Sequence, residues 1–197
     1  GDGAAYLFEH SAGTWTQTAK LTASDGGPGD EFGYSVAVRG NVAAIGAFRD
    51  NDAGTSSGSV YVYQEDESGW IERQKLTATD ASEGAWFGVS VAIADDCIVV
   101  GATRESSLAH RSGAAYVFER EASVWTQTAK LIPADGEAYD RFGEAVAITD
   151  NCILVGAYGD DDSGGAAGSA YLFERSAEGW TQTEKLLAAD GGDNDYF

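Results

Sequence analysis

The sequence predicts an all-β protein in which one four-stranded antiparallel unit is repeated along the chain. Three observations predict this fold class: a 55-residue period, short β-branched apolar runs within each period, and no helical stripe. The period follows from residues that recur at the same spacing without insertion, namely Trp15, Trp70, Trp125 and Trp180, and Lys20, Lys75, Lys130 and Lys185. The chain therefore holds 197/55, or about 3.6, copies of one unit.

The first two strands of each unit, A and B, are short and apolar. In the first complete unit they are predicted at 35–38 and 42–47, where β-branched residues suit strands that are buried on both faces. The tight polar turn Arg39, Gly40 and Asn41 joins them. Strands A and B are therefore expected to form a hairpin.

The last two strands, C and D, are predicted at 60–64 and 70–76, with a short acidic turn between them. Each unit is thus an antiparallel meander that begins at a Phe-Gly pair. Complete units are predicted at 32–84, 87–139 and 142–194, and residues 1–29 supply strands C and D of a further unit.

A four-stranded sheet with two apolar faces cannot bury both faces alone, so copies are expected to stack face to face. Radial stacking of such sheets, called blades, gives a β-propeller, which typically has about 4 to 8 of them. Three complete blades and a half blade cannot close a ring. The chain is therefore expected to be a segment of a larger propeller, or else to complete its ring with a second copy. The segment is favoured, and the absence of Met also suggests a processed piece or fragment.

The residues at each unit boundary resemble a known family. The Phe-Gly pair, the S-V-A-[VI] strand that follows and the Gly-Ala that ends strand B are similar to the FG-GAP repeat, which is found in the propeller of integrin α chains and in many secreted bacterial proteins. The resemblance covers the whole chain and implies an extracellular or cell-surface adhesion module. The Pro of the family pattern is replaced by Phe48, Thr103 and Tyr158.

The formal charge of −20, from 32 acidic and 12 basic side chains, argues against a nucleic-acid partner because phosphate backbones would be repelled. No run approaches the roughly 20 apolar residues that span a bilayer, so membrane insertion is not expected. The acids concentrate in the B–C and D–A loops, which a meander places at one end of each blade. That end is expected to attract cations or a basic partner.

Two of the B–C loops suggest calcium, because Ca²⁺ prefers clustered oxygen ligands. The predicted ligands are Asp50, Asn51 and Asp52 in one loop and Asp160, Asp161 and Asp162 in another. The middle blade should lack such a site, since it has Glu105, Ser106 and Ser107 there. The alternative is that these aspartates cap turns in a solvated loop.

Neither known calcium pattern fits fully. The twelfth position of an EF-hand loop would be Tyr61 or Tyr171 instead of Glu. Integrin-type FG-GAP blades carry their calcium loop between strands A and B, which here is only a tight turn, so the family's calcium residues are not transferred.

Other repeated residues are interpreted as structural. Asp25 recurs in every copy and is expected to fix the D–A crossover through bonds to the backbone. Cys97 and Cys152 lie one period apart on neighbouring sheets, about 10 Å from each other, too far for a disulfide, and are expected to be buried free thiols.

Candidate ligand-binding residues lie in the middle blade. Trp86 falls outside the tryptophan period and replaces Glu31, Arg141 and Tyr196 beside the Phe-Gly pair, where it could stack on a ligand. The other candidates are in the neighbouring B–C loop: Arg104, His110 and Arg111, with Leu108 between them.

The favoured function is an interaction module that binds a protein or glycan through the B–C and D–A loops. An enzyme is not expected, because no zinc triad, Ser-His-Asp arrangement or phosphate-binding loop is present. The alternatives are a propeller domain of a secreted polysaccharide-active enzyme, a lectin, or a structural surface-layer component.

Removal of metal tests the calcium prediction. EDTA should lower the melting temperature and Ca²⁺ should restore it, because the ion would neutralise the loop carboxylates. Asp50→Ala combined with Asp160→Ala should abolish the difference. An unchanged thermal unfolding curve would leave these loops as solvated turns.

Overall fold

The computed structural model describes residues 2–197, which form fourteen β-strands and contain no helix, so this part of the chain has no helix able to cross a membrane. One two-stranded and three four-stranded sheets result, and within each sheet the strands that are consecutive in the chain pair antiparallel. The all-β prediction is therefore confirmed. The strands are β1 Ala5–Ser11, β2 Thr14–Leu21, β3 Ser35–Arg39, β4 Val42–Ala47, β5 Ser59–Asp66, β6 Gly69–Leu76, β7 Phe87–Ala94, β8 Cys97–Ala102, β9 Ala114–Glu121, β10 Val124–Leu131, β11 Phe142–Ile148, β12 Cys152–Ala157, β13 Ser169–Ser176 and β14 Gly179–Leu186.

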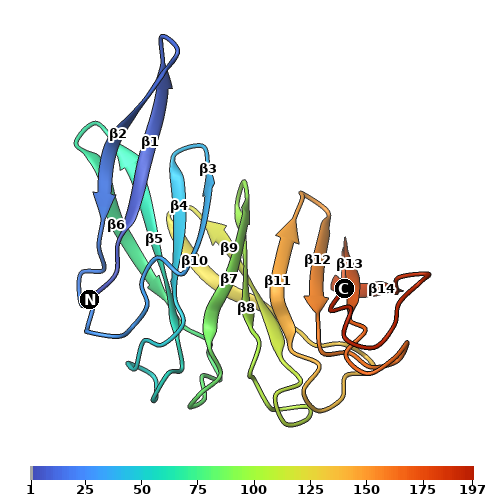
Figure 1. The fold of residues 1–197 in the computed structure, drawn as a ribbon. Coiled ribbons are helices and arrows are strands. Elements are labelled where there is room, and N and C mark those ends of the chain that lie inside the picture. Colours follow the sequence, from blue (N-terminus) through green and yellow to red (C-terminus); the bar gives the residue numbers. More distant parts are fainter. Residues whose placement is uncertain (1) are drawn as a thin grey trace.

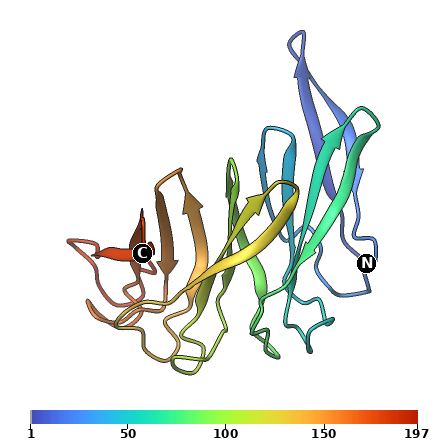
Figure 2. The same ribbon diagram turned by 180° about the vertical axis from the view of Figure 1, so that it is seen from behind.

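The sheets stack face to face. Figures 1 and 2 show them side by side in an open fan, with β1–β2 at one end and β11–β14 at the other. Three apolar clusters fill the spaces between successive sheets; one, for example, joins Val62 of β5 to Ile98 of β8. Adjacent residues of β8 take part in different clusters, since Ile98 faces one neighbouring sheet and Val99 the other. Burial on both faces explains the continuous apolar runs of β4, β5, β8 and β9. The same burial was predicted for strand A at 35–38, but this was wrong, because Val36 and Val38 of β3 are exposed.

The long loops lie together at one edge of the fan. The B–C loops at 48–58, 103–113 and 158–168 and the D–A loops gather at the lower edge in Figure 1, and the hairpin turns point to the upper edge. The lower edge is called the loop face and the upper edge the hairpin edge. This division agrees with the meander predicted from the sequence.

Each Phe-Gly pair joins one sheet to the next. The backbone N–H of Phe87 donates to the carbonyl of Ser57 at 3.0 Å, and Gly58 forms a parallel bridge with Phe87. The Phe87 ring packs edge-on against Tyr116 and Phe118 of its own sheet, with centroids 5.5 and 5.9 Å away. The phenylalanine therefore anchors the new sheet while its backbone holds the preceding loop.

Strand B of one sheet approaches strand A of the next sheet so closely that glycine is required in strand B. A Cβ on Gly46 would lie 2.1 Å from the carbonyl oxygen of Gly88 in the next sheet, and one on Gly101 would lie 1.9 Å from that of Gly143. Ser35 Oγ donates to the Gly88 carbonyl at 2.8 Å across the same junction. The Gly-Ala that ends strand B is thus a packing requirement between sheets.

Both cysteines are free, as predicted; Cys97 is buried and Cys152 is half-buried. Burial, together with the nearby Glu119 carboxylate, raises the pKa of the Cys97 thiol to about 12. At neutral pH this side chain is a small apolar group rather than a nucleophile.

Glycine substitutions at one repeated position should differ in their effect on stability, according to whether another sheet packs against the glycine. Gly46→Ala should destabilise the protein by about 1–3 kcal/mol or more, because the new methyl group overlaps the backbone of β7. Chemical denaturation measures the change. Gly156→Ala is the matched control, since its methyl group would meet only Ala145, at 3.5 Å. Equal losses in the two variants would contradict this account of the junction.

Candidate functional site

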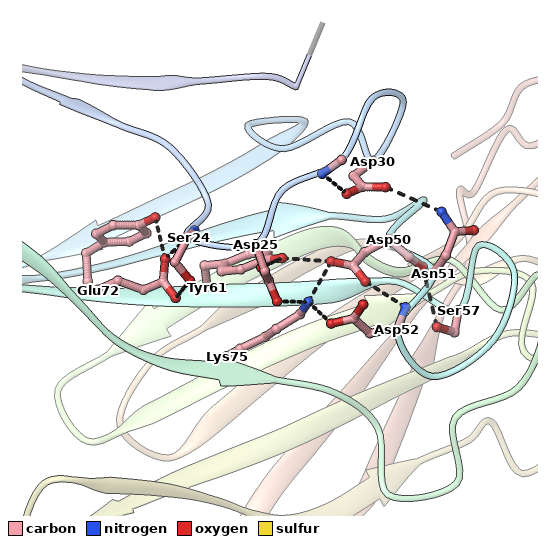
Figure 3. Close-up of polar contacts among 12 residues, drawn as sticks. Ser24, Asp25, Asp30, Asp50, Asn51, Asp52, Ser57, Tyr61, Glu72 and Lys75 are labelled. Atoms are coloured by element: carbon pink, nitrogen blue, oxygen red, sulfur yellow. Dashed lines mark hydrogen bonds and ion pairs between the residues drawn. The ribbon is translucent and has the colours of Figure 1, made fainter.

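A lysine occupies the centre of the acidic cluster on the loop face. Lys75 Nζ, from β6, lies 2.8 Å from Asp25 Oδ2 and 2.9 Å from Asp50 Oδ2, and it also contacts the Asp52 carboxylate (Figure 3). Asp50 is buried, with 2% of its surface exposed. Acids of the B–C and D–A loops therefore meet around a cation that the chain itself supplies.

Tyrosine completes the cluster. Tyr61 of β5 pairs across the strand with Lys75, and its hydroxyl lies 2.7 Å from both Asp25 Oδ1 and Asp50 Oδ2. Because the hydroxyl has one proton, it donates to one carboxylate at a time. The Asp25, Asp50, Asp52, Tyr61 and Lys75 group joins a D–A loop, a B–C loop and two strands; we call it the lysine cluster.

The lysine cluster recurs in the other complete sheets. Lys185 binds Asp135 at 2.9 Å and Asp160 at 2.8 Å. In the middle sheet Lys130 binds Asp80 at 2.6 Å and Glu105 at 3.3 Å, so Glu replaces the buried Asp without loss of the ion pair. Lys20, in the two-stranded sheet, has no ion pair within residues 2–197 and lies over the Tyr6 ring.

Charge pairing shifts the titration of these groups. Burial alone would raise the pKa of the Asp160 carboxyl, but hydrogen bonds from Lys185 and Tyr171 lower it below its ordinary value of 3.8. Burial alone would also lower the pKa of Lys185, but its carboxylate partners raise it. Both groups are therefore charged at neutral pH.

The predicted calcium ligands do not surround an open cation site, because the aspartates converge on a lysine and Asn51 does not join them. Asn51 turns away from its neighbours and bonds Asp30 and the backbone N–H of Ser56, while Asp50 and Asp52 bind Lys75. In the second loop, Asp160 and Asp162 bind Lys185 in the same way. Within residues 2–197 no group of three or more His, Cys, Asp or Glu is arranged to hold a metal ion. Calcium binding stays a prediction, and it requires the ammonium groups to leave.

Asp25 has the structural position expected of it, but its main partner is different. The sequence predicted bonds to the backbone of the crossover, whereas the carboxylate binds the side chains of Lys75 and Tyr61 in the sheet that follows. The difference arises because strand pairing places Lys75 beside Tyr61, within reach of the loop.

The predicted ligand residues lie partly together. The Arg104 guanidinium stacks on the Trp86 ring, 3.2 Å from its centroid, and Phe48 packs edge-on against the same ring at 4.9 Å. Arg111 is near enough that its charge helps to lower the pKa of Arg104, after the larger effect of burial. His110 instead packs against Tyr139, with ring centroids 5.2 Å apart.

Three segments of the chain match a known protein family, at the same spacing as the sequence repeat. The FG-GAP repeat family matches residues 15–63, 70–118 and 125–173, about three quarters of the chain. The chain belongs to the FG-GAP repeat family. A search of curated proteins finds no match.

The family unit runs from strand D of one sheet to strand C of the next, so unit and sheet are out of phase. The first match contains Asp25, Asp50, Asp52 and Tyr61, whereas Lys75 belongs to the second. The clusters around Lys75 and Lys130 therefore each connect two successive FG-GAP repeats, whereas Lys185 lies beyond the last matched segment.

Sequence reasoning missed two further basic residues near Trp86. The Arg49 guanidinium lies 5.2 Å from the Phe48 centroid and 6.0 Å from that of Trp86, and the charge of Arg141 helps to lower the pKa of Arg104. A signal was present for Arg141, because it occupies the repeat position of Trp86.

Removal of one lysine tests the lysine cluster. Lys75→Met should destabilise the protein by about 3–5 kcal/mol, because the buried Asp50 carboxylate loses its cation. Chemical denaturation at pH 7 measures the loss. Lys20→Met removes the same residue type from the same repeat position without breaking an ion pair, and should leave stability unchanged.

The pH dependence gives a second readout for the same pair of variants. Asp25 and Asp160 have folded-state pKa values below the ordinary 3.8, so their charged forms stabilise the folded state above pH 3.8. This contribution is lost as the pH falls through the folded pKa values. Asp140, whose pKa is raised by burial, opposes the trend. The deficit of Lys75→Met should shrink below about pH 4; a constant deficit would contradict the ion-pair account.

Proposed function

We propose that this chain forms part of a β-propeller-type interaction module that binds a protein or glycan through its loop face, without catalytic chemistry of its own. FG-GAP repeats suggest a protein-interaction role, and they occur in extracellular or surface proteins. An extracellular or cell-surface location and an adhesive role are parts of the same proposal. So is a closed ring, completed by further blades or by a second copy.

One observation supports the loop face most strongly: different side chains stand on an identical, strained backbone. Glu31, Trp86, Arg141 and Tyr196 occupy one repeat position, each with positive φ, at 61°, 62°, 61° and 55°. Bulky residues in this region are uncommon, and such strain concentrates at functional sites. The FG-GAP framework thus holds one position constant in shape while its chemistry varies from blade to blade.

Hydrogen bonds hold this position in place. The N–H groups of Trp86, Arg141 and Tyr196 donate to the carbonyls of Ser56, Arg111 and Ala166, at 3.3, 3.3 and 3.1 Å. Each acceptor residue also has positive φ. A rigid support with exchangeable side chains suits recognition, because little conformational entropy is lost on binding.

A ligand screen with matched variants tests the proposal. A glycan array and a phage-displayed peptide library are probed with the intact chain, with Trp86→Ala and with Arg39→Gln at the hairpin edge. Ligands selected on the intact chain should bind Arg39→Gln equally and lose about tenfold or more affinity for Trp86→Ala, as expected for an aromatic contact residue.

Two outcomes would contradict the proposal. One is equal binding of every ligand to both variants, which would place recognition away from the loop face. The other is release of reducing ends from acidic polysaccharides by the intact chain, which would indicate an enzyme. Thermal unfolding of each variant verifies that it is folded.

A further inference from the structure

The arginines of this chain fall into two groups. Five arginines form ion pairs with carboxylates. Four of these lie near the hairpin edge, namely Arg39, Arg73, Arg120 and Arg175. The fifth is Arg49, which lies 3.8 Å from Glu31. Arg104, Arg111 and Arg141 form no ion pair within residues 2–197, although the chain has 32 acidic side chains. In so acidic a protein, three unpaired arginines on one face require an explanation.

The backbone brings these three arginines together. Thr103, which precedes Arg104, donates its hydroxyl to the Arg141 carbonyl at 3.1 Å, and the Arg141 N–H donates to the Arg111 carbonyl at 3.3 Å. The side chains thus start from connected points on a B–C loop and on the entry to β11. After burial, the charges of Arg111 and Arg141 are the largest causes that lower the pKa of Arg104. Their positive charges therefore reinforce one another.

The Arg104 guanidinium lies over the Trp86 ring, and its Nε is buried without a hydrogen-bond partner within residues 2–197. Buried donors are nearly always paired, so this Nε–H is a donor whose partner the described residues do not supply. The nearby acids do not pair with it: Glu105 binds Lys130, and Glu31 binds Arg49.

We propose that Arg104, Arg111 and Arg141 form a site for the carboxylates of an acidic protein segment. The inference rests on the proposed function and specifies its ligand. Guanidinium groups bind carboxylates through paired, charge-assisted hydrogen bonds, and three such groups match closely spaced Asp or Glu side chains.

The surroundings favour a protein over an acidic glycan. Arg104 covers one face of the Trp86 ring and Phe48 packs edge-on against the ring, so the face under the guanidinium cannot serve as a platform for a sugar. Leu108 and Tyr139, which flank the arginines in sequence, are 44% and 54% exposed. Arginine beside exposed aromatic and apolar side chains is typical of protein interfaces.

The net charge makes the test discriminating. At −20 the protein repels acidic molecules in general, so an acidic peptide that binds must find a local positive site. The probe is a dye-labelled Asp-Glu hexapeptide, followed by fluorescence anisotropy at low salt. A neutral Asn-Gln hexapeptide and an oligogalacturonate serve as comparisons.

Single arginine variants identify the site. The acidic peptide should bind the intact chain, and Arg104→Gln and Arg141→Gln should each weaken it about tenfold or more, as loss of a charge-assisted contact predicts. Arg39→Gln makes the same charge change at the hairpin edge and should leave affinity unchanged. Arg111→Gln provides an independent variant should Arg104→Gln fail to fold.

Three results would overturn the proposal: no binding of the acidic peptide, an equal loss in Arg39→Gln, or tighter binding of oligogalacturonate than of the peptide. Ligands from the array or library that depend on Trp86 but tolerate all three arginine changes would leave the interaction module standing and remove only the carboxylate site. If the intact chain binds neither the acidic peptide nor any ligand from the array or library, the proposed function is removed as well.

Discussion

The arrangement of the sheets depends on the close approach of strand B of one sheet to strand A of the next. At each junction a backbone carbonyl of one strand occupies the space that a side chain of the preceding sheet would need, so only glycine fits. This contact sets the separation of neighbouring sheets and thereby the fit of the side chains between them. It also fixes where each B–C loop meets the following Phe-Gly pair. The loop face inherits its geometry from this constraint.

The lysine cluster adds a second, electrostatic connection between repeats. Transfer of Asp50 and Lys75 out of water is costly, and their attraction roughly offsets that cost when every partner is present. A hydrophobic replacement would hold the loops less selectively, because apolar contacts lack direction. The substitution of Glu105 for Asp in the middle sheet supports this interpretation: the carboxylate changes length but still reaches its lysine. We infer that the lysine cluster contributes more to the position of the loops than to the net stability of the fold.

Much of the fold could be predicted because the repeat displays each strand several times. The Phe-Gly pairs marked the start of each sheet. The short polar turns indicated which connections lie at the hairpin edge and which lie on the loop face. The calcium interpretation counted carboxylates in the loops but not Lys75, which lies 23 residues after Asp52 in the chain. That lysine reaches the loop only because Tyr61 and Lys75 are opposite each other in the β5–β6 register. Register depends on a bulge between Val62 and Tyr63, which no single residue signals.

The arginine group was harder to predict for a related reason. Trp86 stood out because it departs from the tryptophan period, but its stacking with Arg104 could not be predicted. The two residues meet because the Arg104 N–H donates to the Ala85 carbonyl, which brings the B–C loop beside Trp86. Arg141 shares the position of Trp86 one repeat later and was noted only as a replacement for tryptophan. Its neighbours in space come from the preceding blade, a relation that appears only when sheets are stacked.

The glycine junctions have a geometric consequence for assembly. Each sheet presents one surface to the sheet before it and a different surface to the sheet after it, so the contact is heterologous and repeats by rotation. Such a contact does not by itself determine how many units are joined. The angle turned at each junction, rather than any recognition between particular repeats, decides whether a series of these units closes and after how many. A whole 55-residue repeat could be duplicated or deleted with the glycine junctions intact, whereas the loss of a few residues within a repeat would break the junctions on both sides.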